Sequence, residues 1–316
     1  MTTLSTTLFA LVDPLSLHRE LYRKLHNSLF PNAAISNTWL DWYHRDLAIA
    51  NGRYSTRTYG AFVDGALVGI WSVEPRRFVT EAKDIVDIGR CFAVGIHPDY
   101  RRHGLFVELS KYAIDQERIL GRYEYILGFP QAGRAVVGGH FKAGWDLVQE
   151  IAPHHIDLSS MDGNTPKSQL QTVGRFDALD LTASPPGSFG VCSDYLQSRW
   201  IKHPDNCYFC FSYEDSYIVL KPYGSVCHIV DLYGRPRGVQ VLLNAAKTLC
   251  RRHRFQELNM WCADNELYRP EVIGAGLSQG SSVVAPVLLI AVGIRSTVPL
   301  TLASGCHFQM GVEESY

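Results

Sequence analysis

Apolar residues recur along the N-terminal half with two spacings, one typical of helices and one typical of strands. Helical spacing predicts two early helices, the second with Thr38 as its N-cap. Alternating spacing predicts a β-hairpin around Asp64-Gly65, a standard two-residue turn. Strand, helix, strand and helix then follow in that order, which predicts an α/β domain. The predicted elements are helices at 15–29 and 38–49, strands at 58–63, 67–73, 87–96 and 125–129, and helices at 105–120 and 133–143, the last ended by Gly144.

The second half repeats this order of elements. Residues 159–188 are rich in Ser, Thr, Pro, Gly and Asp and read as a linker. A helix at 193–202, strands at 208–213, 217–222 and 226–232, a helix at 239–252 and a strand at 257–261 are predicted after it. An offset of 134 positions places Arg101 on Arg235 and Gly104 on Gly238, which indicates an internal repeat. The predicted division is a first domain at 1–158, a linker at 159–188 and a second domain at 189–316.

Composition narrows the class of protein. Lys and Arg number 30 and Asp and Glu 31, so the chain lacks the broad positive field of a dedicated binder of nucleic acid or anionic membrane. No basic residue precedes the apolar N-terminus, so no secretory signal is predicted and the protein is expected in the cytoplasm. The uncharged stretch 272–294 contains Gly, Ser and Pro, and is expected to form a buried strand pair. No metal site is predicted, since His154 and His155 are neighbours on a strand and face opposite ways.

The chemically informative segment is 92–106, where a strand runs into Pro98, a basic turn follows and a helix begins near Gly104. The first N–H groups of a helix have no partner inside the helix, and its dipole is positive there. Gly104 lets the backbone approach a ligand closely, and Arg101 and Arg102 add donors suited to phosphate. The turn therefore predicts a pyrophosphate site. A solvated basic turn before an ordinary helix is the alternative that the residues leave open.

This segment resembles the GNAT acetyltransferase superfamily, whose pattern is Gln/Arg-x-x-Gly-x-Gly/Ala between a strand and a helix. Arg101 and Gly104 match the first two key positions, whereas Phe106 stands where Gly or Ala is usual. Residues 126–130 and 141–145 are similar to the next strand of the family and to its helix ending in Gly-aromatic. The second half resembles a degenerate second GNAT domain.

The resemblance implies an α/β fold of two tandem domains, each a mostly antiparallel sheet with a splayed parallel pair flanked by helices. It implies acetyl-CoA, or another acyl-CoA, as co-substrate, with the backbone of 92–96 beside the pantetheine arm and the N–H groups of 101–105 on the pyrophosphate. In the second half Pro236 lacks an N–H, so that half is expected to shape the acceptor pocket or an interface instead. The residues assigned to acyl-CoA are Phe92, Val94, Ile96, Arg101, Arg102, His103, Gly104, Leu105 and Phe106.

Catalytic groups follow from the same resemblance and from the chemistry. Many family members carry a Tyr where this chain has His140, which is therefore the candidate general acid. Glu74 and Asp87 are the candidate general bases, with solvated strand-end carboxylates as the alternative for each. The predicted function is acyl transfer to an amine of a small acceptor. A nucleotide-linked amino sugar is one candidate, because residues 308–314 resemble the tail of some tandem GNAT proteins.

The sequence leaves an alternative function and several properties of the reaction open. The alternative function is that of a non-catalytic acyl-CoA-binding or scaffold protein with the same fold. Acyl length, N- or O-acylation and a homodimeric state are not fixed by the sequence. A small molecule is the expected partner, and neither nucleic acid nor a membrane is expected.

Overall fold

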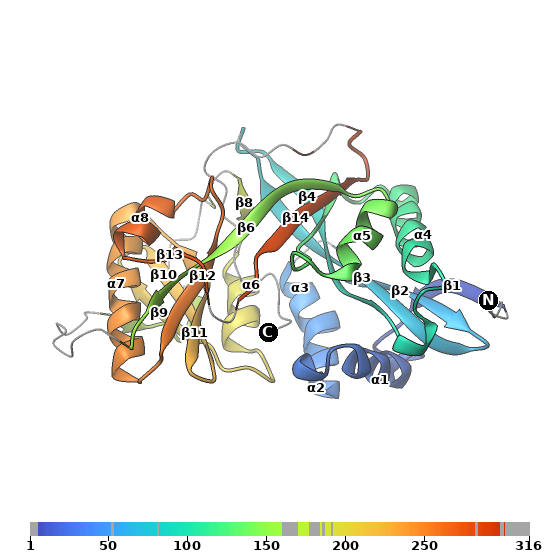
Figure 1. The fold of residues 1–316 in the computed structure, drawn as a ribbon, viewed down its shortest axis with the longest axis horizontal. Coiled ribbons are helices and arrows are strands. Elements are labelled where there is room, and N and C mark those ends of the chain that lie inside the picture. The colour runs from blue at the N-terminus through green and yellow to red at the C-terminus, as the bar shows by residue number, and fades with distance from the viewer. Residues whose placement is uncertain are drawn as a thin grey trace.

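The computed structural model describes residues 6–51, 54–80, 82–159, 170–176, 184, 187–190, 192–281, 284–297 and 300. Two lobes lie side by side, and the long strand β6 runs from one to the other (Figure 1). Each lobe has a sheet with helices packed on it, and the predicted α/β class of two tandem domains is confirmed.

The first lobe follows the predicted order of elements except at its start, where an unpredicted strand at 7–12 precedes the first helix. Helix α4 has the predicted limits, Asp64 and Gly65 take the positive φ values of a tight hairpin turn, and Gly144 ends α5 with φ 94°. Its elements are β1 (Thr7–Val12), α1 (Arg19–Leu29), α2 (Asn37–Asp41), α3 (Leu47–Asn51), β2 (Arg57–Val63), β3 (Ala66–Val79), β4 (Ile85–Ile96), α4 (Leu105–Leu120), β5 (Tyr125–Gly128), α5 (Ala135–Lys142) and β6 (Asp146–Asp157).

One predicted cap is wrong. Ser36, not Thr38, caps α2, because its Oγ accepts a hydrogen bond from the Trp39 N–H at 2.9 Å. Helix α2 then passes through a π-helical turn, Trp42–Asp46, into α3. A π-helical turn follows α6 in the second lobe as well, at Gln197–Ile201, so the repeat extends to this irregularity.

The second lobe repeats the first. The elements of this half of the chain, two of which (β8 and β14) pair with strands of the first lobe, are β7 (Gln171–Thr172), β8 (Ser188–Gly190), α6 (Ser193–Leu196), β9 (Phe209–Tyr213), β10 (Ser216–Tyr223), β11 (Val226–Tyr233), α7 (Pro236–Arg252), β12 (Glu257–Cys262), α8 (Arg269–Gly274), β13 (Ser278–Gln279) and β14 (Val287–Gly293). Most of the predicted linker lies outside the described residues, and at its far end β8 pairs with β3 of the first lobe.

In both lobes, antiparallel strands are followed by one parallel pair. Strands β1 to β4 are antiparallel and β4 runs parallel to β5, while β9 to β11 are antiparallel and β11 runs parallel to β12. The same order of pairing in each lobe is what the internal repeat predicts.

The lobes exchange strands where each sheet is completed. Strand β14, near the end of the chain, lies between β5 and β6 and pairs antiparallel with both. The later part of β6 crosses into the second lobe, where residues 152–157 pair with β12. A cut at residue 158 therefore separates strands that pair with each other. The expectation of a buried strand pair at 272–294 is wrong in two respects. Helix α8 includes residues 272–274, and the two strands that follow, exposed β13 and buried β14, each pair with β6 and not with each other.

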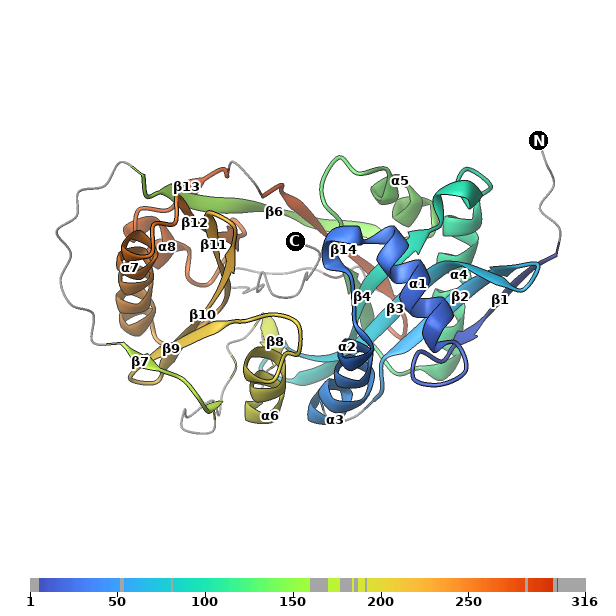
Figure 2. The same ribbon diagram turned by 90° about the horizontal axis from the view of Figure 1, so that it is seen from below.

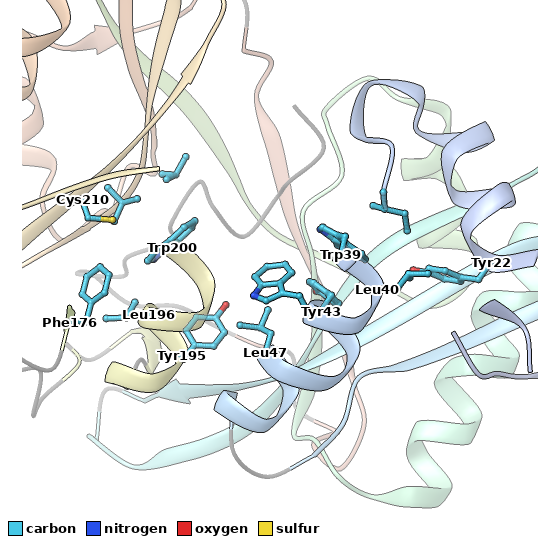
Figure 3. Packing of buried hydrophobic residues seen from close by; sticks show 14 of the residues in the cluster. Tyr22, Trp39, Leu40, Tyr43, Leu47, Phe176, Tyr195, Leu196, Trp200 and Cys210 are labelled. Atoms are coloured by element: carbon cyan, nitrogen blue, oxygen red, sulfur yellow. The ribbon is translucent and has the colours of Figure 1, made fainter. Parts of the chain in front are cut away.

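Helices α2, α3 and α6 lie at the junction of the lobes (Figure 2), and an apolar cluster of their side chains joins the lobes there. Trp39, Tyr43 and Leu47 face Tyr195 and Trp200 across the junction (Figure 3). The indole N–H of Trp42 also donates to the backbone carbonyl of Ser198 at 3.0 Å. Burial of several large aromatic side chains between the lobes holds them as one body. In the part of the chain that the structure describes, no helix combines the length and the apolar character needed to cross a membrane.

Candidate active site

The candidate site begins where β4 and β5 separate. These parallel strands pair only at Gly89–Ile126 and Arg90–Leu127, whereas the other edge of β4 stays paired with β3 as far as Ile96. No described strand covers the free edge of residues 91–96. The register of β4 also shifts at a bulge, where Ala93 takes a positive φ of 46°. A bulge beside a splayed pair turns backbone N–H and C=O groups toward the gap.

A cavity of about 400 Å³ fills this gap. Residues 91–94 form one wall, residues 128–131 form another, and α5 contributes Val136 and His140. The loop after α1 closes it with residues 29–33. Of the strand residues assigned to acyl-CoA, Phe92 and Val94 line this cavity, while Ile96 is buried in the core under α4. We call this the donor cavity.

The predicted anion turn is open on its helix side. Arg102 and Gly104 have φ values of 69° and 81°, and α4 starts at Leu105. The N–H groups of residues 102–106 have no acceptor among the described residues. Residues 101–104 are exposed. Free N–H groups at the positive end of a 16-residue helix make this turn a candidate anion site.

Arg101 has a different place from the one predicted. Its backbone N–H donates to the carbonyl of Pro98 at 3.2 Å, and its Nε donates to the carbonyl of Ile96 at 2.9 Å. Both bonds hold the turn closed, so the unpaired N–H groups begin at Arg102 and not at Arg101. Arg101 therefore shapes the anion site more than it extends into it.

The departure at Phe106 is compensated by a glycine on α5. A Cβ at Gly139 would lie 2.5 Å from Cδ1 of Phe106, far inside van der Waals contact. The Phe106 ring also meets the ring of His140 edge to face, with centroids 5.1 Å apart. The large side chain thus fits because the facing position has none. The same contact links the start of α4 to the donor cavity, which His140 lines.

We expect Gly139→Ala to lower the free energy of unfolding by about 1–3 kcal/mol, because the added methyl overpacks this contact. Gly138→Ala is the matched control, since a Cβ at Gly138 would meet no atom within 4 Å, and it should be neutral or stabilising in a helix. Phe106→Ala should make Gly139→Ala tolerable in a double-mutant cycle measured by urea denaturation. Additive losses in the double variant would contradict the proposed compensation.

His140 is neutral in this environment. His140 is 4% exposed, and burial lowers the pKa of its imidazole to about 4. Its ring packs between Phe106 and Trp145, and Nδ1 has no hydrogen-bond partner among the described residues. The predicted acid role requires a charged ring, and the free protein does not hold one at neutral pH.

Glu74 lies at the centre of a buried ionic cluster. It is 2% exposed, and its Oε2 accepts from the Tyr43 hydroxyl at 2.6 Å and from Arg90 Nε at 2.9 Å. Arg76 Nη1 lies 3.6 Å from Oε1. Burial alone would raise the pKa of this carboxyl, but the attraction of Arg90, Arg76 and Arg199 outweighs it and lowers the pKa to about 2. So acidic a group is a weak base, and Glu74 lines neither cavity of the site.

Asp87 is not brought to the cavity. It lies on β4 opposite Arg77, three residues before Arg90, on the side where β4 and β5 are still paired. The gap opens in the other direction. Among the described residues there is also no group of three or more His, Cys, Asp and Glu that could hold a metal ion.

A second cavity, of about 260 Å³, lies on the other side of the bulge. Arg90, Phe92 and Ala93 line it from β4, and Trp39 lines it from α2. The second lobe contributes Asp205, Asn206 and Lys221. We call it the acceptor cavity. It shares with the donor cavity the residues Phe30, Asn32, Ala33, Phe92 and Ala93, so the two meet at the bulge.

Comparison of folds identifies the architecture. A GCN5-related N-acetyltransferase from Anabaena variabilis has a TM-score of 0.64 at 13% identity, over 92% of this chain and 73% of that one. A probable N-acyltransferase from Enterococcus faecalis gives 0.64 at 12% identity, with the same coverage. A putative acetyltransferase from Pyrococcus horikoshii gives 0.61 at 11% identity, over 100% and 97% of the two chains. The sequence matches no model of a protein family and no curated protein.

The chain has the fold of the GCN5-related N-acetyltransferases.

This N-acetyltransferase fold occurs twice, but the second copy has a closed turn. Pro236 occupies the first turn of α7, where it removes an N–H. A Cβ at Gly234 or Gly238 would lie 2.0 or 2.1 Å from Ser216 Oγ, so Ser216 fills the space in front of the helix. Asp215 pairs with Arg235 at 2.8 Å and places a carboxylate at the same turn. The second copy of the N-acetyltransferase fold therefore lacks the open anion site of the first.

Proposed function

We propose that this protein is a CoA-dependent acyltransferase that moves an acetyl or similar acyl group to an amine of a small acceptor. One observation carries the proposal: the two cavities meet at the bulge of β4, the strand that leads from the donor cavity to the free N–H groups at the start of α4. The fold shared with N-acetyltransferases supports it.

The residues of the donor cavity and of the turn before α4 fit the parts of an acyl-CoA donor. The N–H groups of residues 102–106 would hold the CoA diphosphate, with Arg102 and His103 beside it. The free edge of β4 would pair with the amides of the pantetheine arm, as an added strand does. The acyl group would then lie at Ala93, where a backbone N–H at the bulge could polarise its carbonyl. The acceptor amine would approach from the acceptor cavity.

The acyl transfer forms a C–N bond, breaks the C–S bond and moves one proton from the nitrogen to the departing thiolate. A neutral imidazole can accept a proton, and an adjacent thiolate would favour its protonated form before that proton is passed on. His140 lines the donor cavity in its neutral form, so we assign it this proton relay in place of a permanently charged acid. Glu74 is assigned to hold Arg90.

Donor binding is tested by thermal and chemical unfolding with acetyl-CoA. At about 100 times its dissociation constant, a ligand of the native state adds about 2.7 kcal/mol to the free energy of unfolding. Arg102→Asp should weaken acetyl-CoA about tenfold, because the new carboxylate repels the diphosphate while Asp still tolerates the positive φ. Lys111→Asp, at an exposed position in the middle of α4, is the control. Unchanged affinity in Arg102→Asp would refute the site.

His140→Gln should lower kcat by about 100-fold with little change in the dissociation constant of acetyl-CoA. His253→Gln, at an exposed position beyond α7, should change neither. The pKa of His140 is about 4, so this residue should not titrate near pH 6.5. The pH profiles of the wild type and of His140→Gln should therefore have the same shape around that pH. Equal kcat in the two proteins would remove His140 from the mechanism.

The non-catalytic alternative has one observation in its favour. Glu74 and His140, two of the groups predicted to transfer protons, both have pKa values well below neutrality. Acetyl-CoA binding without CoA release across a broad panel of amines would favour a binding protein. A nucleotide-linked amino sugar belongs in that panel beside smaller amines.

A further inference from the structure

The second lobe contains an apolar cavity of about 320 Å³ that the proposed acyl transfer does not use. It lies between the end of α7 and strands β9, β10 and β11, and we call it the second-lobe cavity. No Asp or Glu is among the described residues that line it. Apolar side chains make up most of its wall: Phe209, Phe211, Leu220, Pro222, Leu249 and Phe255. Its volume is at the small end of the range for ligand pockets, and its wall favours an apolar ligand.

Two cysteines extend the wall without adding charge. Cys227 on β11 and Cys250 on α7 both line the second-lobe cavity and are buried. The hydrogen bond with Cys250, together with burial, raises the pKa of the Cys227 thiol well above its ordinary value. A buried neutral thiol behaves as a small apolar group. The cysteines therefore leave the cavity apolar at neutral pH.

The first lobe fills the corresponding position. Helices α4 and α7 bury residues at the same spacing: Leu109, Ala113 and Glu117 in α4, and Leu242, Ala246 and Cys250 in α7. Cys250 therefore stands where α4 has Glu117, whose carboxylate accepts from the Tyr59 hydroxyl at 2.7 Å and from Arg122 Nη2 at 2.8 Å. An open apolar space lowers stability, because the atoms around it lose contacts. The second copy of the fold thus keeps a costly space that the first copy fills.

Exposed cations stand beside the second-lobe cavity. Arg252 lies three residues after Leu249, on the same side of α7, and Arg254 directly precedes Phe255. Both arginines are exposed, and neither forms an ion pair with a described residue. Phe209 lines the cavity and is still 47% exposed, so the cavity is open to solvent on that side. An open apolar cavity with arginines beside it favours a ligand that has a hydrocarbon chain and an anionic end.

We propose that the second-lobe cavity binds the hydrocarbon chain of a fatty acid, with its carboxylate at the surface near Arg252 and Arg254. The carboxylate stays outside because burial of an unpaired charge in an apolar wall is costly. The small volume favours a chain of medium length. The cavity shares no lining residue with the donor and acceptor cavities, so the inference does not depend on the proposed acyl transfer.

Calorimetric titration of the full chain with straight-chain carboxylates, from hexanoate to decanoate and below their micelle-forming concentrations, tests the proposal. Affinity should rise about fourfold for each added CH₂ until the chain fills the cavity. Octanoate should bind about threefold more tightly than octanol, a small ratio because exposed arginines pair weakly. The double variant Arg252→Gln, Arg254→Asn should lose this ratio and keep the dependence on chain length, since Asn tolerates the φ of 61° at position 254.

Leu249→Trp places a larger side chain in the cavity wall and should weaken octanoate at least about tenfold. Cys250→Met fills the same space from a second position and should weaken octanoate as well. Leu120→Trp makes the matched change at the exposed end of α4 and should bind octanoate as the wild type does. Thermal unfolding of each variant shows that it is folded before its affinity is compared.

Three results would each overturn the proposal: no binding of any carboxylate by the wild type, an affinity independent of chain length, or unchanged affinity in folded Leu249→Trp and Cys250→Met. Binding to vesicles of anionic phospholipid without binding of any monomeric carboxylate would also overturn it, because a membrane would then be the partner. All titrations are made without acetyl-CoA, so a failure of the acyltransferase proposal leaves their outcome unchanged.

Discussion

Glu74→Gln is expected to lower the free energy of unfolding by about 3–5 kcal/mol at neutral pH, measured by urea denaturation. The glutamine keeps the shape of the side chain but removes its charge. Arg90 and Arg76 would then stay buried beside a neutral amide, with Arg199 close enough to act on the same site. A buried charge left without its counterion costs far more than an exposed ion pair contributes.

The same carboxylate predicts how the stability of the wild type depends on pH. The pKa of Glu74 is about 2 in the folded protein, against 4.5 for the ordinary group. Its contribution is therefore complete above about pH 4.5 and is lost as pH falls toward 2, because the unfolded chain binds the proton first. At about 1.36 kcal/mol for each pH unit between these values, the loss is about 3 kcal/mol.

Glu74→Gln should lack this part of the acid dependence. Glu150→Gln is the matched control, since Glu150 is exposed on β6 and makes no ion pair with a described residue. It should change the stability by less than about 0.5 kcal/mol. Equal stability of Glu74→Gln and Glu150→Gln would show that the cluster does not depend on this charge.

Local signals in the sequence were enough to predict the parts of the site that are continuous in the chain. The helix at 105–120, the glycine at its start and the turn before it are encoded within a few residues, and the structure has them there. The fit of Phe106 was not predictable, because Gly139 lies 33 positions away and no periodicity links the two.

Residues brought together by tertiary structure were missed. Arg90, Asp205 and Lys221 meet at one cavity, but they come from β4, from a loop and from β10. The sequence shows Glu74 as a carboxylate on a strand and gives no sign of the arginines that surround it. Its predicted role as a base came from residue type, whereas its low pKa comes from neighbours that only the fold supplies.

The pairing of β14 and β6 across the two halves of the chain also could not be predicted from sequence patterns. Strand β14 has the apolar composition of a buried strand, but composition does not say which sheet it joins. It joins the first lobe, between β5 and β6, although the predicted first domain ends more than a hundred residues earlier. This placement has a direct consequence for any attempt to separate the lobes.

A protein of residues 1–158 is expected neither to unfold cooperatively nor to bind acetyl-CoA. Without β14, the edges of β5 and β6 lose their partner. Val287, Leu289, Ile290 and Val292 are buried in this strand, and burial of such side chains contributes about 1.5–3 kcal/mol each. The sum, roughly 6–12 kcal/mol, equals the whole stability of a typical domain.

Joining residues 284–297 to 1–158 through a flexible linker should recover cooperative urea unfolding, since β14 can then return to its place. The matched control is the same fusion with Ile290→Asp, which places a charge at a fully buried position and should fail to recover it. Circular dichroism during denaturation and acetyl-CoA binding provide the two measurements. If residues 1–158 alone unfold cooperatively and bind acetyl-CoA, the exchanged strand is dispensable and the first lobe is an independent domain.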